Sequence, residues 1–316
     1  MRNRQVKVAV VQAAPILFNK QSALDKIAVV MKEAAEQGAE LIVFPEVFLP
    51  GYPRGLSFGA RVGSRTPEGR KDWERYWSSA IDVPGNETKQ IGDLARELGV
   101  HLVIGVVERD QEFSTGTLFN TMIYIGPDGE LLGKHRKLVP TGSERLLWGQ
   151  GDGSTLTVID TPFGRVGGLI CWENYMPLAR TAMYAQGIDI YVAPTADARD
   201  SWQSTIRHIA CEGRCFVLSC NQFATRESYP ADLACYPDIE QDPEVLSRGG
   251  SAIVGPLGEY VAEPLYNQEG MLVATLDLSE VVQSRFDFDP VGHYSRPDVF
   301  QLIVNETKQD IVQRKQ

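Results

Sequence analysis

The stretch Gly167-Gly168-Leu169-Ile170-Cys171-Trp172-Glu173-Asn174 indicates the architecture, because it has the pattern of a buried strand that ends in a cysteine. A helical pattern follows at 176–186, with Pro177 in the first turn, where proline is tolerated. A thiol at a strand-to-helix turn has the geometry of a nucleophile elbow. The helix start would stabilise a thiolate, and backbone N–H groups there could bind developing negative charge. From composition alone, a buried structural thiol is the commoner fate of a cysteine.

Strand and helix patterns alternate on both sides of this turn. Strands are expected at 6–11, 41–44, 101–107, 120–125, 131–137, 155–160, 165–170, 188–193, 216–219, 251–254 and 272–278. Helices are expected at 22–37, 87–98, 176–186 and 202–213. The turn Pro256-Leu257-Gly258 is expected to join the last two strands as a β pair. The pattern predicts an α/β fold in which two mixed sheets pack face to face with helices outside.

The chain of 316 residues contains no Pro/Ser-rich linker between its halves, so 1–316 is expected to form a single domain. Its core should span about 6–280, and 281–316 should be a C-terminal extension. The polar stretch from Asn305 onward is expected to be a mobile or interface tail.

Composition limits the partners and the compartment. The net charge of −10 argues against nucleic acid and anionic membranes, which require a basic face. No run of about 18 apolar residues predicts a transmembrane helix. The start, Met1-Arg2-Asn3-Arg4-Gln5, lacks the apolar core of a signal peptide. Five cysteines, an odd number, fit free thiols in a reducing cytoplasm.

A second unusual segment is Phe44-Pro45-Glu46-Val47-Phe48-Leu49-Pro50-Gly51-Tyr52-Pro53. It places the Glu46 carboxyl just after a buried strand, where α/β proteins hold their ligand sites. Apolar neighbours raise the pKa of a carboxyl and suit it for proton transfer. The alternative is a glutamate that organises hydrogen bonds within the loop.

The third segment is Gly133-Lys134-His135-Arg136-Lys137-Leu138-Val139-Pro140-Thr141. On a strand, His135 and Lys137 would face one way, and Lys134 and Arg136 the other. One pair can therefore point into a site while the other remains in water. A solvated basic face is the alternative interpretation.

The remaining cysteines are expected to be structural, and no metal site is expected. Cys211 and Cys215 are four residues apart, but Gly213 lies between them and no nearby residues complete a zinc set. His135, which would share the face of Lys137, leaves a Cys–His dyad with Cys171 open at this point.

Taken together, the three segments resemble the motifs of the nitrilase superfamily, and within it of the true nitrilase branch, over roughly 6–305. The segment at 44–53 is similar to the catalytic-glutamate motif, that at 135–141 to the lysine motif, and that at 171–178 to the nucleophile motif. Three such motifs in this order are a highly specific signal. The segments 193–197, 208–213 and 291–297 are also similar to nitrilases.

The resemblance implies roles for four residues. Cys171 would be the nucleophile, Glu46 the general base, Lys137 the stabiliser of the tetrahedral intermediate, and Glu144 a second glutamate beside the lysine. The chain departs from the family at Gly142-Ser143, where an apolar residue or histidine is common. The resemblance also implies a four-layer α-β-β-α sandwich and no cofactor. It further implies a homodimer formed through helices near the nucleophile. In many relatives such dimers grow into spirals or filaments.

The implied reaction is hydrolysis of an organic nitrile by water to a carboxylic acid and ammonia, through a thioimidate and a thioester on Cys171, with amide as a possible by-product. An apolar pocket is expected, with Tyr52, Trp148, Trp172 and Pro194 as substrate contacts or, alternatively, as ordinary packing. Aliphatic, aryl, arylaceto- and cyanoalanine substrates remain open. The alternatives are an amidase or carbamoylase of the same superfamily, a cyanide-degrading enzyme, and a non-catalytic scaffold. The Cys-Trp-Glu-Asn form favours nitriles.

Overall fold

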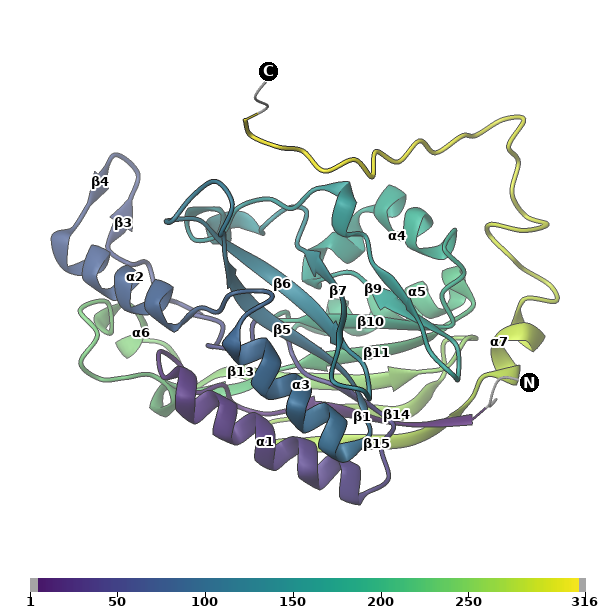
Figure 1. Cartoon of the computed structure of the whole chain (residues 1–316), viewed down its shortest axis with the longest axis horizontal. Coiled ribbons are helices and arrows are strands. Elements are labelled where there is room, and N and C mark those ends of the chain that lie inside the picture. The colour runs from purple at the N-terminus through teal and green to yellow at the C-terminus, as the bar shows by residue number, and fades with distance from the viewer. Residues whose placement is uncertain (1–4, 313–316) are drawn as a thin grey trace.

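Two large sheets lie face to face in the computed structural model, which describes residues 5–312 (Figure 1). The first sheet has the order β15-β1-β2-β5-β6-β7. Its strands are β1 (Gln5–Gln12), β2 (Leu41–Val43), β5 (His101–Arg109), β6 (Leu118–Ile125), β7 (Leu131–Arg136) and β15 (Gly270–Asp277). β1, β2 and β5 run parallel, whereas β15, β6 and β7 join by antiparallel pairing, so the sheet is mixed.

The second sheet has the order β12-β13-β11-β10-β9-β8, and β14 pairs with β13. Its strands are β8 (Val158–Asp160), β9 (Arg165–Gly168), β10 (Ile190–Thr195), β11 (Phe216–Asn221), β12 (Phe223–Thr225), β13 (Val245–Val254) and β14 (Tyr260–Tyr266). β9, β10 and β11 are parallel, and the others pair antiparallel. The prediction of two mixed sheets is therefore confirmed.

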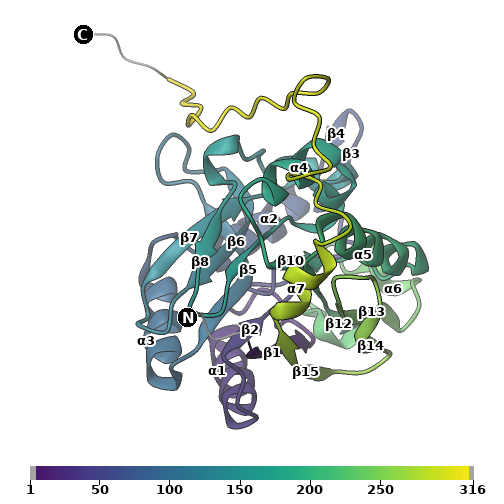
Figure 2. The ribbon, with the colours of Figure 1, turned by 90° about the vertical axis from the view of Figure 1, so that its right-hand side faces the viewer.

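Helices form the two outer layers (Figures 1 and 2). α1 (Lys20–Glu36) and α3 (Asn86–Leu98) cover the first sheet, and α4 (Pro177–Tyr184) and α5 (Asp200–Gly213) cover the second. α2 (Pro67–Ser79), α6 (Pro237–Glu240) and the hairpin of β3 (Ala60–Arg61) and β4 (Ser64–Arg65) lie at one end, and α7 (Ser279–Ser284) follows β15. Short 3-10 helices occupy Gly142–Leu146, Gly153–Thr155, Cys171–Tyr175 and Arg226–Ser228.

Three apolar clusters hold the four layers together. Val8 of β1 and Val192 of β10 belong to the cluster between the sheets. The neighbouring Ala9 points to the other face and packs in the cluster that contains Ile27 of α1. Ile206 of α5 belongs to a third cluster on the outer face of the second sheet. Because strands buried on both faces need apolar residues at every position, their sequences are continuous apolar runs, and the fold is the expected α-β-β-α sandwich.

The predicted pairing of the last two strands is wrong. β15 pairs antiparallel with β1, and the partner of β13 across the Pro256-Leu257-Gly258 turn is β14. β14 contains Pro264 and is largely half-exposed, as edge strands are, so a search for apolar runs does not find it. α2 was also not predicted, because its thirteen residues are mostly polar or charged.

The extension expected at 281–316 begins inside α7, and after α7 it forms no further helix or strand as far as residue 312 (Figure 2). Its described part contacts the body: Lys308 pairs with Glu112, and the Gln309 N–H donates to Asp152 Oδ2 at 2.7 Å. The described residues do not include the last four residues of the predicted tail, 313–316. They also do not include Met1–Arg4, part of the stretch expected to lack the apolar core of a signal peptide. Across 5–312, no helix is long and apolar enough to cross a membrane.

Candidate active site

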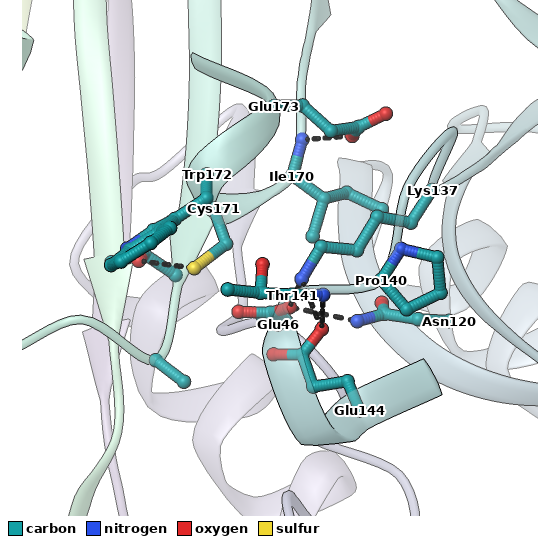
Figure 3. Close-up of polar contacts among 12 residues, drawn as sticks. Glu46, Asn120, Lys137, Pro140, Thr141, Glu144, Ile170, Cys171, Trp172 and Glu173 are labelled. Carbon is teal, nitrogen blue, oxygen red and sulfur yellow. Dashed lines mark hydrogen bonds and ion pairs between the residues drawn. The ribbon is translucent and has the colours of Figure 1, made fainter. Parts of the chain in front are cut away.

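Three side chains from distant parts of the sequence meet between the sheets (Figure 3). Glu46 follows β2, Lys137 follows β7, and Cys171 lies shortly after β9. All three are almost completely buried, with exposed fractions of 1%, 0% and 4%. The structure therefore brings together the nucleophile, base and lysine that the sequence suggested.

Cys171 has a backbone φ of +52°, a left-handed conformation that is uncommon for a residue with a side chain. This bend turns the chain out of the strand, as in a nucleophile elbow. A 3-10 helix, Cys171–Tyr175, comes next, and α4 begins only at Pro177. The helix expected at 176–186 is therefore confirmed as α4, and the short 3-10 helix separates it from the thiol.

The thiol of Cys171 is protonated at rest. Burial, together with the charge of Glu46, raises its pKa to about 12, and the ammonium of Lys137 opposes this only in part. The hydroxyl of Thr195 donates to Sγ at 3.2 Å. The thiol therefore needs a base at the moment of attack, which is the role that the resemblance implied for Glu46.

Glu46 is placed by a tight turn against β5. A side chain at Gly105 would come within 2.4 Å of the Pro45 carbonyl oxygen, so only glycine allows this approach. Asn120 Nδ2 donates to Glu46 Oε1 at 2.7 Å. Burial raises the pKa of the Glu46 carboxyl despite the nearby ammonium. Within the described chain Oε2 is buried without a hydrogen-bond partner, so this oxygen is available to accept a proton.

Lys137 stands between two carboxylates. Its Nζ donates to Glu46 Oε1 at 2.7 Å and to Glu144 Oε2 at 2.8 Å. Burial lowers the pKa of the ammonium, but the adjacent carboxylates outweigh burial and leave that pKa above its usual value. Lys137 therefore remains a cation. Tyr52 OH donates to Glu144 Oε1 at 2.7 Å, which fixes the second glutamate beside the lysine as expected.

The predicted alternation along β7 is confirmed. His135 and Lys137 point inward, whereas Lys134 Nζ and the Arg136 guanidinium reach Glu108 at 2.6 Å and 2.7 Å on the other face. The basic run therefore provides one buried pair and one structural ion-pair cluster.

His135 does not form a dyad with the thiol. Its Nε2 lies 3.0 Å from Glu173 Oε2, and its Nδ1 lies 2.9 Å from the Thr155 carbonyl oxygen. Both ring nitrogens face acceptors, an arrangement that favours the doubly protonated imidazolium. Burial lowers its pKa, but the charge of Glu173 outweighs burial and raises it.

Glu173 connects the lysine loop to the elbow, and Figure 3 shows its contact with Ile170 in the elbow. It accepts hydrogen bonds from the N–H of Leu138 at 2.6 Å and of Ile170 at 2.8 Å. These residues directly follow Lys137 and precede Cys171. Sequence reasoning missed this role and those of Asn120 and Thr195, because the contacts with Leu138, Glu46 and Cys171 span 35, 74 and 24 positions.

A cavity of about 430 Å³ opens beside the thiol. It is lined by Tyr52, Arg54, Thr141, Glu144, Cys171, Trp172, Ala196, Asp197, Ala198, Arg199, Val245, Leu246 and Arg248. Two of the four predicted substrate contacts, Tyr52 and Trp172, lie in this wall. Trp148 lines a second cavity of about 400 Å³ that shares Tyr52, and Pro194 is buried in β10 and lines neither. The lining is mixed: Tyr52, Trp172, Val245 and Leu246 supply the apolar surface that was expected, but the charged residues Arg54, Glu144, Asp197, Arg199 and Arg248 are more than a few polar anchors.

Among residues 5–312, no group of three or more His, Cys, Asp or Glu side chains could hold a metal ion. The five cysteines are free thiols, and Cys211 and Cys215 hold no shared ligand set. The ionisable groups gathered at the cavity include the thiol of Cys171, the buried carboxyl of Glu46 and the buried ammonium of Lys137.

The sequence matches the carbon-nitrogen hydrolase family model over residues 7–286. It is 53% identical to an aliphatic nitrilase of Sinorhizobium fredii, with 97% of each chain covered. It is 52% identical to a nitrilase of Bradyrhizobium diazoefficiens, covering 96% of this chain and 94% of that protein. A bifunctional nitrilase/nitrile hydratase of Lupinus angustifolius is 49% identical, covering 95% and 86%.

Solved structures share the fold. A member of branch 10 of the nitrilase superfamily from Saccharomyces cerevisiae superposes with a TM-score of 0.71 at 22% identity, covering 95% of this chain and 98% of that one. An amidase from Nesterenkonia sp. gives 0.65 at 22% identity, covering 91% and 96%. The chain therefore belongs to the carbon-nitrogen hydrolase family, on its nitrilase branch.

Proposed function

We propose that this protein hydrolyses an organic nitrile to a carboxylic acid and ammonia, with Cys171 as nucleophile, Glu46 as base and Lys137 with Glu144 as the electrostatic partners. The observation that carries the proposal is the buried Glu46–Lys137–Glu144 cluster beside the Cys171 thiol at a cavity. Relatives named nitrilases at about half identity support the nitrile as substrate.

The first step follows from the protonation states. Glu46 takes the thiol proton as Sγ bonds to the nitrile carbon. One carbon–nitrogen π bond breaks, and its electron pair on nitrogen takes that proton from Glu46, which gives a thioimidate and leaves Glu46 ionised for the next step. A nitrile carbon is a weak electrophile, so a strong nucleophile is required. The free Oε2 of Glu46 suits this transfer.

Two waters complete the reaction. Glu46 deprotonates the first as its oxygen bonds to the same carbon, and Lys137 stabilises the tetrahedral species. Breaking the carbon–nitrogen bond, with proton transfer to nitrogen, releases ammonia and leaves a thioester. A second water then releases the acid and restores the thiol. If the carbon–sulfur bond breaks before the carbon–nitrogen bond, the product is the amide.

The test supplies a panel of nitriles and their matching amides to the wild-type protein and to Cys171→Ala, with acid, amide and ammonia measured. Nucleophile and base act as a unit, so the variant should lose activity by orders of magnitude. Turnover by Cys171→Ala at the wild-type rate would refute the scheme. Hydrolysis of amides but not of nitriles would instead identify an amidase. The cavity of about 430 Å³ favours an organic nitrile over cyanide alone.

We further propose that 1–316 acts as one domain, that it works in the cytoplasm, and that it forms homodimers able to extend into spirals. Leu178 on α4 is 68% exposed, and Ile303 in the extension is 89% exposed. These exposed apolar side chains support self-association through α4 and through the extension. Sizing with light scattering of wild type and Leu178→Asp tests this: the variant should shift to smaller species.

A further inference from the structure

Three guanidinium groups line the cavity that contains Cys171: those of Arg54, Arg199 and Arg248. Two of them have carboxylate partners. Arg199 Nε donates to Asp197 at 2.8 Å, and Arg248 Nη2 donates to Asp200 at 2.5 Å. These two side chains are 58% and 38% exposed, so they form the outer part of the wall.

Arg54 differs because no carboxylate within residues 5–312 lies within ion-pair distance of it. Its Nη2 donates to the Ala196 carbonyl oxygen, and its guanidinium lies 5.6 Å from the centre of the Tyr52 ring. A guanidinium carries five N–H donors, so most remain available for a ligand. Ala196 directly follows Thr195, the residue that holds the Cys171 thiol, which places the cation next to the reacting centre.

A neutral nitrile provides nothing for this charge. The reaction itself uses Lys137, whose ammonium is already engaged by Glu46 and Glu144. Placing an apolar substrate against a half-buried guanidinium without a counter-ion is unfavourable, because the cation loses water without gaining an opposite charge. The same group is well matched to a planar carboxylate, which it binds through two parallel hydrogen bonds.

We propose that Arg54 anchors a carboxylate on the substrate, so that the natural substrate is a small nitrile-bearing carboxylic acid. This inference rests on the proposed nitrile hydrolysis. The nitrile carbon lies at Sγ of Cys171 and the carboxylate at Arg54, within the cavity of about 430 Å³. Water converts such a substrate into a dicarboxylate and ammonia, and the dicarboxylate keeps its contact with Arg54 until release.

The experiment compares ω-cyano carboxylates with two to five methylene groups against their methyl esters, which have the same nitrile and no charge. For wild type, kcat/KM should be higher for the acid than for its ester at one best length. Hydrogen bonds to ionised groups predict a loss of about 10- to 100-fold in the acid-to-ester ratio for Arg54→Gln. Arg54→Lys, which keeps the charge but lacks the fork, should lose part of this ratio.

Arg96→Gln is the matched control, because it removes a guanidinium from α3 on the outer surface and should leave the ratio at the wild-type value. The dicarboxylate of the best length should inhibit wild type competitively, through a rise in KM. The monocarboxylate of equal length should not inhibit it. This comparison requires no variant. Equal kcat/KM for acid and ester at every length, or an equal loss for both in Arg54→Gln, overturns the anchor while leaving nitrile hydrolysis intact. Failure to hydrolyse any nitrile contradicts the proposed function instead.

Discussion

Replacing Glu173 with glutamine should separate the role of this residue in catalysis from its role in stability. Its carboxylate accepts hydrogen bonds from His135, Leu138 and Ile170, at 3.0, 2.6 and 2.8 Å. Glutamine keeps one acceptor oxygen and turns an NH₂ group toward a donor, so at least one buried N–H loses its partner. Hydrogen bonds to charged groups contribute about 1.5–3 kcal/mol, so the free energy of unfolding should fall by about 2–4 kcal/mol.

The effect on the rate should exceed the effect on stability. Glu173 is the shared acceptor of the loop that carries Lys137 and the elbow that carries Cys171, so its loss lets the two move relative to each other. A shift of about 1 Å at reacting groups costs on the order of 100-fold in rate. We expect kcat to fall by about that factor with little change in KM, and the acid-to-amide ratio to change.

The assay is steady-state kinetics with both products measured, together with urea unfolding, at a temperature where each variant is folded. Glu108→Gln is the matched control: Glu108 is equally buried and binds Lys134 and Arg136, but on the face of β7 away from the thiol. It should lose stability without a change in product ratio. If Glu173→Gln loses stability but keeps kcat and the product ratio within about twofold of wild type, the positioning role is refuted.

Three further predictions follow from the charges of the site. Because burial raises the pKa of Glu46, the acid limb of the pH profile of kcat/KM should have an apparent pKa above the value of about 4.3 that is usual for glutamate. An apparent pKa at or below that value contradicts Glu46 as the base. Thr195→Val should slow alkylation of Cys171 by iodoacetamide about tenfold at fixed pH, because the thiolate loses a hydrogen-bond donor. Thr195→Ser keeps the hydroxyl and should react like wild type. Equal rates for all three proteins would show that the hydroxyl does not act on the thiol. The pKa of His135 is raised in the folded state, so its ion pair with Glu173 contributes fully to the free energy of unfolding below about pH 6.5, and this contribution is lost as the pH rises through the folded-state pKa. In urea unfolding, the stability of His135→Gln should lack this decline with pH. Identical pH profiles of stability for the variant and wild type would count against the imidazolium.

Much of the fold could be predicted from local pattern. The strand ending at Val43 and the helix ending before Gly99 follow from apolar runs and a terminal glycine, and both occur within a few residues of expectation. The pairing of β15 with β1 could not be predicted, because it joins Gln5 to Asp277 across almost the whole chain. β14 escaped because an edge strand with a proline has no apolar signature.

The sequence by itself determined which chemistry-bearing residues are present: the motifs around Glu46, Lys137 and Cys171, and the alternation that directs Lys137 inward. Only the tertiary structure decided their states, because a pKa depends on burial and on charges that folding brings together. Glu46 and Lys137 are 91 positions apart, yet their side chains lie 2.7 Å from each other. Folding also buries the thiol of Cys171 beside Glu46 and joins the lysine loop to the elbow through Glu173. It places in the cavity wall the guanidinium of Arg54, which has no carboxylate partner among residues 5–312.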